Sequence, residues 1–336
     1  MPPRRRHIGI ADVADRAGVS VTTVSHVLSS RRPVSAATRE RVRQAIEELG
    51  YRPNELARSM RTQRTSTIGL VIPDITNPFY TSVARGLQDI LAPAAYYGIV
   101  CNTDAEPAVE RAVVEQLVTR RVDGIAFAGY YEHDKDIQPA IAAGIPVVLL
   151  GARTPGPGYD AVCSDDHGGG RQAAEYLIER GYRRIAFITG PAGEGPPAER
   201  VAGYRGALAA AKIAADPELV VRVAIGREGG AEAMARLLDR TDPPDAVICT
   251  NDIVAIGALD TARQRGLRIP RDVAILGFDD IEAAALISPA LTTMANPARE
   301  IGQAVGRLLL QRLDEPEPTP PQAIVFACRL TRRDSA

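Results

Sequence analysis

Short apolar runs alternate with segments of helical period through most of the chain, and the alternation occurs twice. In the first half, strands are expected at 68–72, 99–101, 124–128 and 146–150, with helices at 79–91, 108–119 and 136–143. In the second half, strands are expected at 184–189, 219–223, 246–250 and 273–277, with helices at 198–211, 231–239 and 253–265. Alternating βα units predict a parallel sheet covered by helices. Two such series predict an α/β core of two Rossmann-like subdomains, followed by a helix at 298–313 and a strand at 323–328.

The segment before the first expected strand has an all-helical pattern. Its first helix carries an apolar face with residues at i, i+3, i+4 and i+7, namely Ile10, Val13, Ala14 and Ala17. Gly18 can end that helix in the left-handed conformation, and the Ser20 hydroxyl can cap a second helix. The inward face of the second helix comprises Val24, Val27 and Leu28. With a third helix at 35–49, this is the helix-turn-helix plan, which places the second helix in the DNA major groove.

The formal charge is divided unevenly between these two parts. Residues 1–65 contain 13 arginines, no lysine and six acids, which gives +7, whereas the whole chain carries −1 and the remainder therefore −8. A basic segment that coincides with a helix-turn-helix suits contact with DNA phosphates, while an acidic body avoids general adhesion to nucleic acid. That coincidence weakens the alternative of a three-helix module that binds protein.

The reactive side chains form no recognisable catalytic or metal-binding motif. Cys101, Cys163, Cys249 and Cys328 are far apart and the four histidines are scattered, so neither metal nor redox spacing is present. Residues 168–173 fit the G-x-G-x-x-A dinucleotide fingerprint, but polar and acidic residues precede them and no strand is expected to lead in. We therefore expect no cofactor, no metal and no enzymatic activity.

No targeting or membrane-spanning segment is expected. The first residues, MPPRRRH, lead directly into the helix-turn-helix pattern without the apolar stretch of a signal peptide. No apolar run approaches the ~20 residues of a membrane span. The sequence therefore predicts a cytoplasmic protein with reduced cysteines and no membrane partner.

Three stretches of the chain resemble the LacI/GalR family of bacterial transcription regulators. They read IADVADRAGVSVTTVSHVL, VSAATRERVRQAIEELGYRPNELARSM and STIGLVIPDITNPFY. The resemblance implies an all-α helix-turn-helix headpiece at 1–65, with a hinge helix at about 53–61. It also implies an effector-binding and dimerisation core at 66–336, built like the periplasmic sugar-binding proteins.

In such a core the chain crosses three times between the subdomains. The resemblance places these crossings near Ser164, Asn296 and Gln322. The N-subdomain would then comprise 66–164 and 297–321, and the C-subdomain would comprise 165–295 and 322–332. The family also has small residues at a helix start near residue 168, which suits close helix packing.

By position, the resemblance assigns roles to side chains of the headpiece. Those expected at base edges are Val21, Thr22 and His26, and those expected at phosphates are Thr23, Ser25, Ser35 and Thr38. In the hinge, Asn54 and Ala57 would lie near the minor groove. Met60 takes the place of the apolar wedge that kinks DNA, where the family usually has Leu. The family's two-fold symmetry implies a homodimer on a near-palindromic operator of double-stranded DNA.

Polar and aromatic side chains follow several expected strands, where open α/β sheets bind ligands. They are Asp74, Asn77, Phe79, Tyr80, Tyr130, Tyr131, Asn251, Asp252, Asp279 and Asp280. With the cleft arginine implied by the resemblance, the expected effector-binding residues are Asp74, Phe79, Tyr80, Tyr130, Arg200, Asn251 and Asp279. The chain departs from the family at Gly151, Ala152, Glu194 and Ile225, the last at a place where a stacking ring is common. The effector is expected to be a sugar or related metabolite, and its identity stays open.

These features predict a sequence-specific DNA-binding repressor whose operator affinity is set by a small-molecule effector. Two alternatives of other classes remain at this point. A solute-binding receptor without a DNA role would share the cleft but needs no basic helical headpiece. A nucleotide-dependent enzyme would need a clear phosphate loop and a catalytic cluster.

Overall fold

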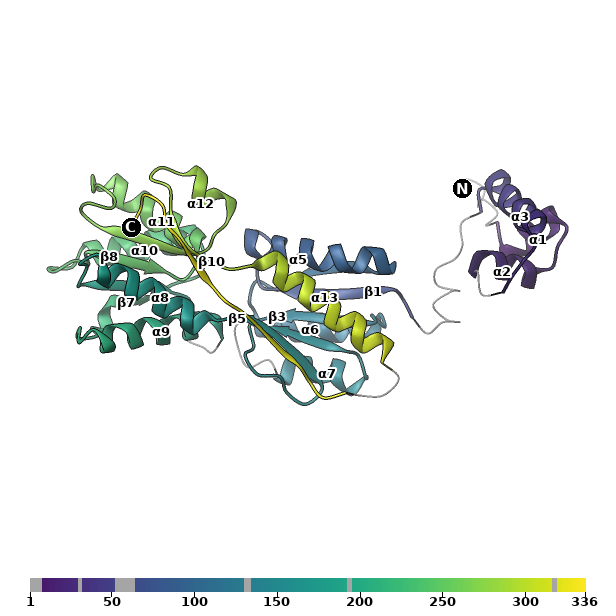
Figure 1. Ribbon diagram of the computed structural model, residues 1–336, viewed down its shortest axis with the longest axis horizontal. Helices are drawn as coiled ribbons and strands as arrows, with labels where there is room; N and C mark the ends of the chain where they lie inside the picture. Colours follow the sequence, from purple (N-terminus) through teal and green to yellow (C-terminus); the bar gives the residue numbers. More distant parts are fainter. Residues whose placement is uncertain (1–7, 30–31, 52–63, 130–133, 192–194, 316–318) are drawn as a thin grey trace, which may run out of the picture. The chain divides into compact units, whose positions relative to one another are not determined.

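The computed structural model describes residues 8–29, 32–51, 64–129, 134–191, 195–315 and 319–336. The chain forms two compact units, Met1–Thr65 and Ser66–Ala336, which we describe one at a time (Figure 1). Several sequence predictions lie outside the described residues: the hinge helix at about 53–61 with Asn54, Ala57 and Met60, and the residues Tyr130, Tyr131 and Glu194.

The headpiece has three helices around a small apolar centre: α1 (Ile10–Ala17), α2 (Val21–Ser29) and α3 (Ala36–Leu49). Gly18 ends α1 with a φ of 62°, and the Ser20 hydroxyl accepts from the Thr23 N–H at 3.1 Å at the start of α2. The buried side chains are Val13, Ala14, Ala17, Val24, Val42 and Ala45. The predicted helix-turn-helix is confirmed, although Leu28, expected to face inward, is 39% exposed.

The core unit begins with a parallel six-stranded sheet of order β11-β5-β4-β3-β1-β2. Its strands are β1 (Thr67–Ile72), β2 (Tyr97–Asn102), β3 (Gly124–Ala128), β4 (Val147–Leu150), β5 (Tyr159–Ser164) and β11 (Ala323–Phe326). Its helices are α5 (Pro78–Leu91), η1 (Ala92–Ala94), α6 (Pro107–Thr119), α7 (Asp134–Ala142) and α13 (Ala298–Asp314). Alternate residues of β1 serve opposite faces, since Leu70 packs in the cluster of α5 and α13 and Val71 in that of α6 and α7. We call this sheet with its helices the first lobe.

The second lobe has a six-stranded sheet of order β12-β10-β9-β8-β6-β7, parallel except for the antiparallel β12. Its strands are β6 (Ile185–Thr189), β7 (Val220–Arg222), β8 (Ala246–Cys249), β9 (Ala274–Asp279), β10 (Thr292–Ala295) and β12 (Arg329–Thr331). Its helices are α8 (Asp166–Glu179), α9 (Pro196–Ala210), η2 (Pro217–Leu219), α10 (Arg227–Leu238), α11 (Asp252–Gln264) and α12 (Glu282–Leu286). The predicted α/β core of two parallel sheets is thereby confirmed.

The third crossing between the lobes lies later than expected. We expected it near Gln322, with 322–332 in the C-subdomain. The strand β11 instead belongs to the first sheet, because Ala323 to Phe326 pair in parallel with Ala161 to Ser164 of β5. The chain therefore crosses between Phe326 and Arg329, where β12 begins (yellow in Figure 1). An apolar run alone cannot indicate which of two sheets its backbone will join.

Strand β5 corrects a second expectation, since it leads almost directly into the glycine run at 168–170. The run nevertheless serves helix packing. A Cβ on Gly170 would lie 2.1 Å from the carbonyl oxygen of Arg200 in α9. Asp165 occupies the start of α8, where its carboxylate accepts from the Gly168 N–H at 3.2 Å and from Arg153 at 2.9 Å. A carboxylate already fills the position that a dinucleotide phosphate would need.

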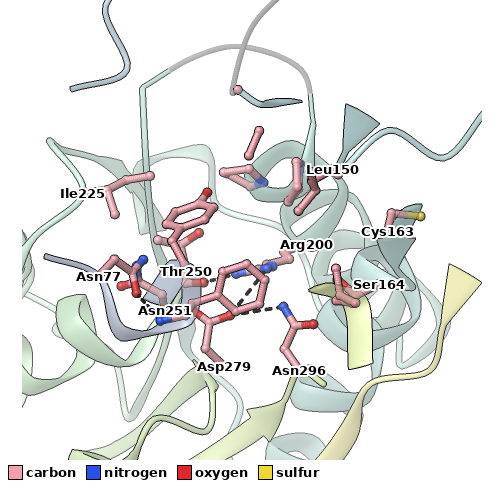
Figure 2. A pocket seen from close by; sticks show the side chains of 18 of the residues that line it. Asn77, Leu150, Cys163, Ser164, Arg200, Ile225, Thr250, Asn251, Asp279 and Asn296 are labelled. Carbon is pink, nitrogen blue, oxygen red and sulfur yellow. Dashed lines mark hydrogen bonds and ion pairs between the residues drawn. The ribbon is translucent and has the colours of Figure 1, made fainter. Parts of the chain in front are cut away.

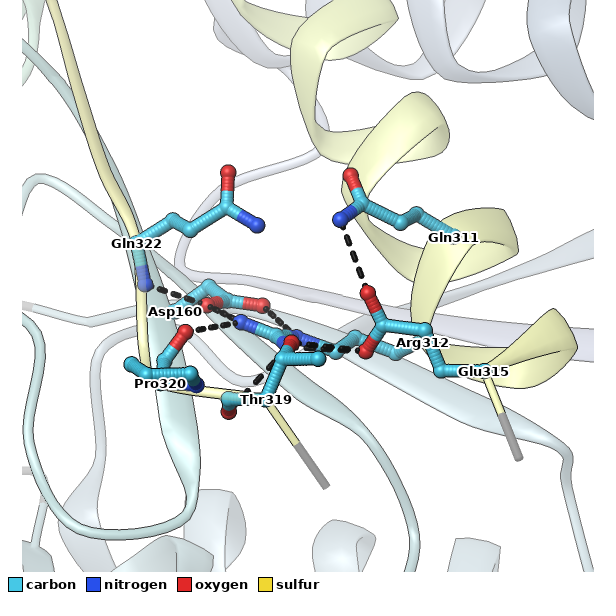
Figure 3. Close-up of polar contacts among 7 residues, drawn as sticks. All are labelled: Asp160, Gln311, Arg312, Glu315, Thr319, Pro320 and Gln322. Atoms are coloured by element: carbon cyan, nitrogen blue, oxygen red, sulfur yellow. Dashed lines mark hydrogen bonds and ion pairs between the residues drawn. The ribbon is translucent and has the colours of Figure 1, made fainter. Parts of the chain in front are cut away.

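An ion-pair cluster around the buried Asp160 fastens the end of α13 to the first lobe (Figure 3). Arg312 donates to both carboxylate oxygens of Asp160, at 2.7 and 2.8 Å, and to Glu315 at 2.9 Å. Asp160 also accepts from the N–H of Gln322 at 2.7 Å, just before β11. Such forked pairs restrict geometry strongly, so the cluster sets where the chain returns to β5. We call it the edge cluster.

Candidate functional site

A pocket lies between the lobes, at the carboxyl ends of both sheets (Figure 2). Its walls include Gly129 after β3, Ser164 at the end of β5, Asn251 after β8, Asp279 at the end of β9 and Asn296 after β10. That position fits a small-molecule site in an open α/β fold. We call it the inner pocket.

Arg200 of α9 is the only cation among the described residues that line the inner pocket. It is 7% exposed, and its Nε donates to Asp166 at 2.7 Å. Its Nη1 donates to the Thr250 carbonyl oxygen, and its Nη2 lies 3.8 Å from Asp279 Oδ1. The guanidinium carbon stands 3.6 Å from the centre of the Phe278 ring. Carboxylates, a carbonyl and a ring thus hold this group in one orientation before any ligand binds.

Asp279 faces Arg200 and also accepts from Asn296 Nδ2 at 3.2 Å (Figure 2). Burial raises the pKa of Asp279 to about 6, although Arg200 and Asn296 favour its ionised form. Together Arg200, Asp166 and Asp279 carry a formal charge of −1. An anionic ligand would therefore meet an arginine whose charge is already balanced.

Neutral polar groups complete the inner pocket. The side-chain oxygens of Asn77 and Asn251 cap α5 and α11 at 3.0 Å, which turns each amide nitrogen to other partners. Thr250 Oγ1 and Asn296 Oδ1 are buried without a hydrogen-bond partner in the described part of the chain. Leaving a buried polar atom without a hydrogen bond costs free energy unless a ligand or water supplies the bond. The pocket therefore offers several neutral donors and acceptors to a polar ligand.

Phe79 and Tyr80, at the start of α5, form the aromatic wall of the pocket. Their ring centroids are 5.2 Å apart and their planes meet at 81°, an edge-to-face pair. Tyr80 is also part of the apolar core of the first lobe. The pair can therefore serve both packing and ligand contact.

The structure brings together five of the seven expected effector-binding residues: Phe79, Tyr80, Arg200, Asn251 and Asp279. Asp74 does not line the inner pocket. Its carboxylate accepts from the N–H and hydroxyl of Thr76 at 2.8 and 2.6 Å, and it borders an adjoining hollow. Tyr130 lies outside the described residues.

Two further acids at strand ends have structural partners instead. Asp252 accepts from the Thr293 hydroxyl at 2.5 Å and from a backbone N–H, and burial raises the pKa of Asp252 to about 8. Asp280 accepts from Arg333 at 2.7 Å and from Thr331 at 3.0 Å. A place at the end of a strand is thus not sufficient evidence for ligand contact.

Sequence reasoning missed the main partner of Arg200. Asp166 is 4% exposed, opens α8 and also accepts from the Ser164 hydroxyl at 3.0 Å. Thr250 was likewise not among the expected residues. The signal for Asp166 was the close packing of α8 on α9, which the glycines at 170 and 203 permit. Reading it requires knowing that these two helices are neighbours.

In the headpiece, the residues expected at base edges lie on α2. Val21 is 44% exposed, Thr22 is exposed, and His26 is half-buried. Of those expected at phosphates, Thr23 and Ser25 are half-buried on the same helix. The other two lie at the start of α3, where Ser35 is the N-cap: its hydroxyl accepts from the Thr38 N–H at 3.3 Å and donates to the Thr38 hydroxyl at 2.9 Å. Their DNA contacts stay predictions.

Neither metal chemistry nor a membrane role gains support from the described residues. Within them, no group of three or more His, Cys, Asp or Glu side chains is placed to hold a metal ion. None of the described helices combines the length and apolar character needed to cross a bilayer. All four cysteines are unpaired, and burial raises the pKa of the Cys328 thiol to about 12.

The chain is similar to known regulators along most of its length. Residues 9–54 match the family described as bacterial regulatory proteins of the lacI family, and residues 174–336 match a periplasmic binding protein-like domain. It is 35% identical over 308 residues to the HTH-type transcriptional repressor PurR of Vibrio atlanticus, covering 91% of this chain and 92% of that one. It is 36% identical to the ribose operon repressor of Escherichia coli, covering 91% and 93%.

Among solved structures, the chain is similar to that of a transcriptional regulator CelR–cellobiose complex. The identity is 35%, the TM-score is 0.75, and the match covers 98% of this chain and 100% of that one. These relatives are named as transcription regulators and repressors, which places the chain among regulators and not among enzymes. The helix-turn-helix headpiece, the two-lobed core and these matches together show that the chain belongs to the LacI family of bacterial regulatory proteins.

Proposed function

We propose that this DNA-binding regulator is a repressor whose operator affinity is set by a small polar effector in the inner pocket. The observation that carries the proposal is one chain that joins a helix-turn-helix to a two-lobed core with buried, unpartnered polar atoms between its lobes. The similarity to the transcriptional repressor PurR and to the ribose operon repressor supports it.

For DNA, we propose that α2 enters the major groove. Val21 and Thr22 offer methyl groups to thymine, and His26 can donate to a guanine acceptor. Thr23, Ser25, Ser35 and Thr38 would bind phosphates and fix the register. Asn54, Ala57 and Met60 of the hinge are proposed at the minor groove from the family resemblance.

We propose that the effector is bound by Arg200, Asn251 and Asp279, with Phe79 and Tyr80 as the apolar wall. Carboxylate, amide and hydroxyl groups match the alternating donors and acceptors of a sugar or related metabolite. Asp74 is kept as a proposed contact at the outer part of the cleft. Tyr130, which lies outside the described residues, is kept as a proposed contact from the family resemblance alone.

The protein acts as a homodimer in this proposal. The edge strand β2 exposes an apolar surface, with Tyr97 at 70%, Ile99 at 44% and Val100 at 39%. An exposed apolar sheet edge needs cover from another chain. A second copy supplies it and gives the two-fold symmetry that reads a near-palindromic operator. Acting on DNA, the dimer would work in the cytoplasm.

Effector binding would change the closure of the lobes and through it the affinity of the headpieces for DNA. A coupling free energy on the order of 1–3 kcal/mol is expected for such a linkage. The test starts by selecting an operator from random duplexes and measuring its affinity for the full chain and for residues 66–336. The full chain should bind, and the shortened one should not.

Salt dependence tests the electrostatic part of the proposal. If some six phosphates are neutralised, log affinity should fall with log salt at a slope of roughly −5. A nearly flat line would contradict DNA binding by the basic headpiece. Titration with NAD and ATP addresses the nucleotide-dependent alternative, and neither should bind.

A further inference from the structure

The chain crosses between the two lobes at three places, and two of these crossings border the inner pocket. The first crossing leads from Ser164, the last residue of β5, to Asp166, the first residue of α8. The second joins β10 to α13 through Asn296, and the third follows β11. Ser164 and Asn296 both line the inner pocket (Figure 2). A change in the angle between the lobes must bend the chain at these crossings, so contacts between the crossings bear on lobe closure.

Asp166 connects the first crossing to Arg200. One oxygen of its carboxylate accepts from the Ser164 hydroxyl at 3.0 Å, and the other accepts from Arg200 Nε at 2.7 Å. All three residues are buried. A bond between a carboxylate and a guanidinium is strong and directional. Because Ser164 belongs to the first sheet and Arg200 to the second lobe, Asp166 holds one side chain from each side of the crossing.

Arg200 continues the connection to the second crossing through Asp279. Its Nη2 forms an ion pair with Asp279 Oδ1 at 3.8 Å, and the same oxygen accepts from Asn296 Nδ2 at 3.2 Å (Figure 2). The Asn296 carbonyl oxygen accepts from the N–H of Ala298, the first residue of α13, at 2.7 Å. The resulting path runs from β5 to the start of α13, and we call it the hinge relay. Its members are Ser164, Asp166, Arg200, Asp279 and Asn296.

Bending at a crossing separates members of the hinge relay. Ser164 pairs with Phe326 of β11 and so moves with the first sheet, whereas Asp166 opens a helix that packs closely on α9. Bending at Asp165 therefore pulls the Ser164 hydroxyl away from the Asp166 carboxylate. A buried polar group that loses its partner is costly, and neighbouring hydrogen bonds in a low dielectric strengthen one another. The two crossings are therefore expected to open together.

We propose that the hinge relay couples the first and second crossings, with Asp166 as the residue that positions Arg200 between them. A ligand in the inner pocket that contacts Arg200 or Asp279 then acts on both crossings directly. The consequence for DNA affinity rests on the function proposed above. The coupling within the core does not, because it needs neither effector nor operator.

Hydrogen exchange of the full chain, followed by mass spectrometry, tests the coupling without any ligand. Asp166→Asn removes the charge that holds Arg200 and nearly preserves the shape of the side chain. The amides of Asn296 and Ala298, at the second crossing, should exchange about fivefold or more faster, because a charge-assisted bond in the relay is weakened. The amides of β3, in the first lobe, are the internal reference and should keep the native rate.

Asp165→Asn is the matched control, because Asp165 lies at the same crossing but outside the hinge relay. Its carboxylate accepts from Arg153 and from the Gly168 N–H, and an asparagine can still cap the helix. Exchange at the second crossing should stay at the native rate in this variant. If both variants sped exchange there equally, or if Asp166→Asn left it unchanged, the relay would not connect the crossings.

A variant at the other end of the hinge relay gives an independent readout. Asn296→Leu removes the amide that donates to Asp279. It should speed exchange of the Asp165 N–H, which donates to the Phe326 carbonyl oxygen at 2.7 Å. Coupling between two sites acts in both directions, so a change confined to the second crossing would overturn the proposal even if Asp166→Asn failed to fold. Operator affinity of the native chain is measured separately, and its absence would refute the regulator while leaving the relay intact.

Discussion

Two arginines of the core are each set between two carboxylates, the buried Arg200 and the half-buried Arg312, and they differ in what they leave unsatisfied. At the edge cluster, Arg312 directs Nε, Nη1 and Nη2 to Asp160, Glu315, Thr319 and Pro320 (Figure 3). In the inner pocket, Arg200 has one close carboxylate, one carbonyl and a second carboxylate 3.8 Å away. Its neighbours Thr250 and Asn296 each keep a buried oxygen without a described partner.

The comparison separates a structural ion pair from a candidate binding site. Each arginine pairs with a buried carboxylate, Asp160 or Asp166, so losing either arginine leaves a buried charge without its partner. The edge cluster satisfies its donors with its own chain, so it can only fasten elements together. In the inner pocket only some of the Arg200 donors have close acceptors, and neighbouring neutral oxygens have no hydrogen-bond partner among the described residues. The difference predicts that one arginine governs stability and that the other also governs ligand affinity.

The largest effect is expected from Arg312→Met. It leaves Asp160, whose side chain is 3% exposed, without its ion pair. Breaking a buried pair typically costs about 3–5 kcal/mol, so the free energy of unfolding in urea should fall by about that amount. Affinity for the effector should stay within a factor of two or so.

Arg307→Met is the matched control, because Arg307 is exposed on the same helix, α13. It should change the free energy of unfolding by no more than about 0.5 kcal/mol. If Arg312→Met were as stable as this control, the edge cluster would have no structural role. If it instead abolished effector binding in a folded protein, the two clusters would not be separable.

The next effect is expected from Arg200→Met. Effector affinity should fall at least about 100-fold, or ~2.7 kcal/mol, because the ligand loses a fixed cation and meets two unpaired carboxylates. Calorimetry with the compound that gives the largest thermal shift in a screen of sugars and related metabolites measures the loss. Arg200→Lys keeps the positive charge without the forked guanidinium. Its effector affinity should therefore lie between those of Arg200→Met and the native chain.

Arg205→Met, on the exposed face of α9, is the control for that experiment. It should leave effector affinity unchanged. Equal loss in both variants would point to a general effect on the helix. Native affinity in Arg200→Met would mean that Arg200, like Arg312, only holds its neighbours in place.

Another buried acid, Glu110 on α6, has no arginine partner among the described residues and extends the comparison. It is 0% exposed, and both its carboxylate oxygens lack a partner among the described residues. Burial raises the pKa of Glu110 to about 7, and the negative charge of Asp136 on α7 adds to this. Because the folded pKa is raised, its contribution to stability is full below pH 4.5 and is lost as pH rises toward 7.

Glu110→Met should remove that dependence. The difference in unfolding free energy between this variant and the native chain should shift in the variant's favour by on the order of 2 kcal/mol from pH 5 to pH 8. Urea unfolding at the two pH values measures the shift. Any change in packing caused by the substitution is the same at both pH values and therefore cancels. A difference that stays constant with pH would show that Glu110 is ionised in the folded chain at both values.

The sequence predicts much of this architecture because the relevant signals are local. The period of apolar residues indicates the helices and the central strands, and Gly18 and Ser20 mark the turn of the headpiece. The family resemblance adds Arg200, Asn251 and Asp279, which do meet in one pocket.

The missed features depend on contacts distant in sequence. Strand β5 was missed because the polar Asp160 interrupts its apolar run. Asp160 is stable inside the strand only because it pairs with Arg312, which lies 152 residues away in the sequence. Strand β11 could have joined either sheet until its register with β5 was known. Asp166 meets Arg200 only because α8 packs on α9. In each case a long-range pairing decides the outcome, and no local pattern encodes it.

The smallest expected effect is a pH dependence of effector affinity that comes from Asp279 in the inner pocket. Burial raises the pKa of Asp279 to about 6. If the effector needs the ionised carboxylate as an acceptor, its affinity should fall as pH drops from 7.5 to 5, by up to about tenfold. Calorimetry at matched ionic strength measures the fall. Asp279→Asn should bind more weakly at pH 7.5 and lose the pH dependence, because an amide does not titrate in this range. A native chain whose affinity is level across these pH values would show that the ligand accepts from Arg200 alone, and the carboxylate of Asp279 would then serve the arginine just as Asp160 serves Arg312.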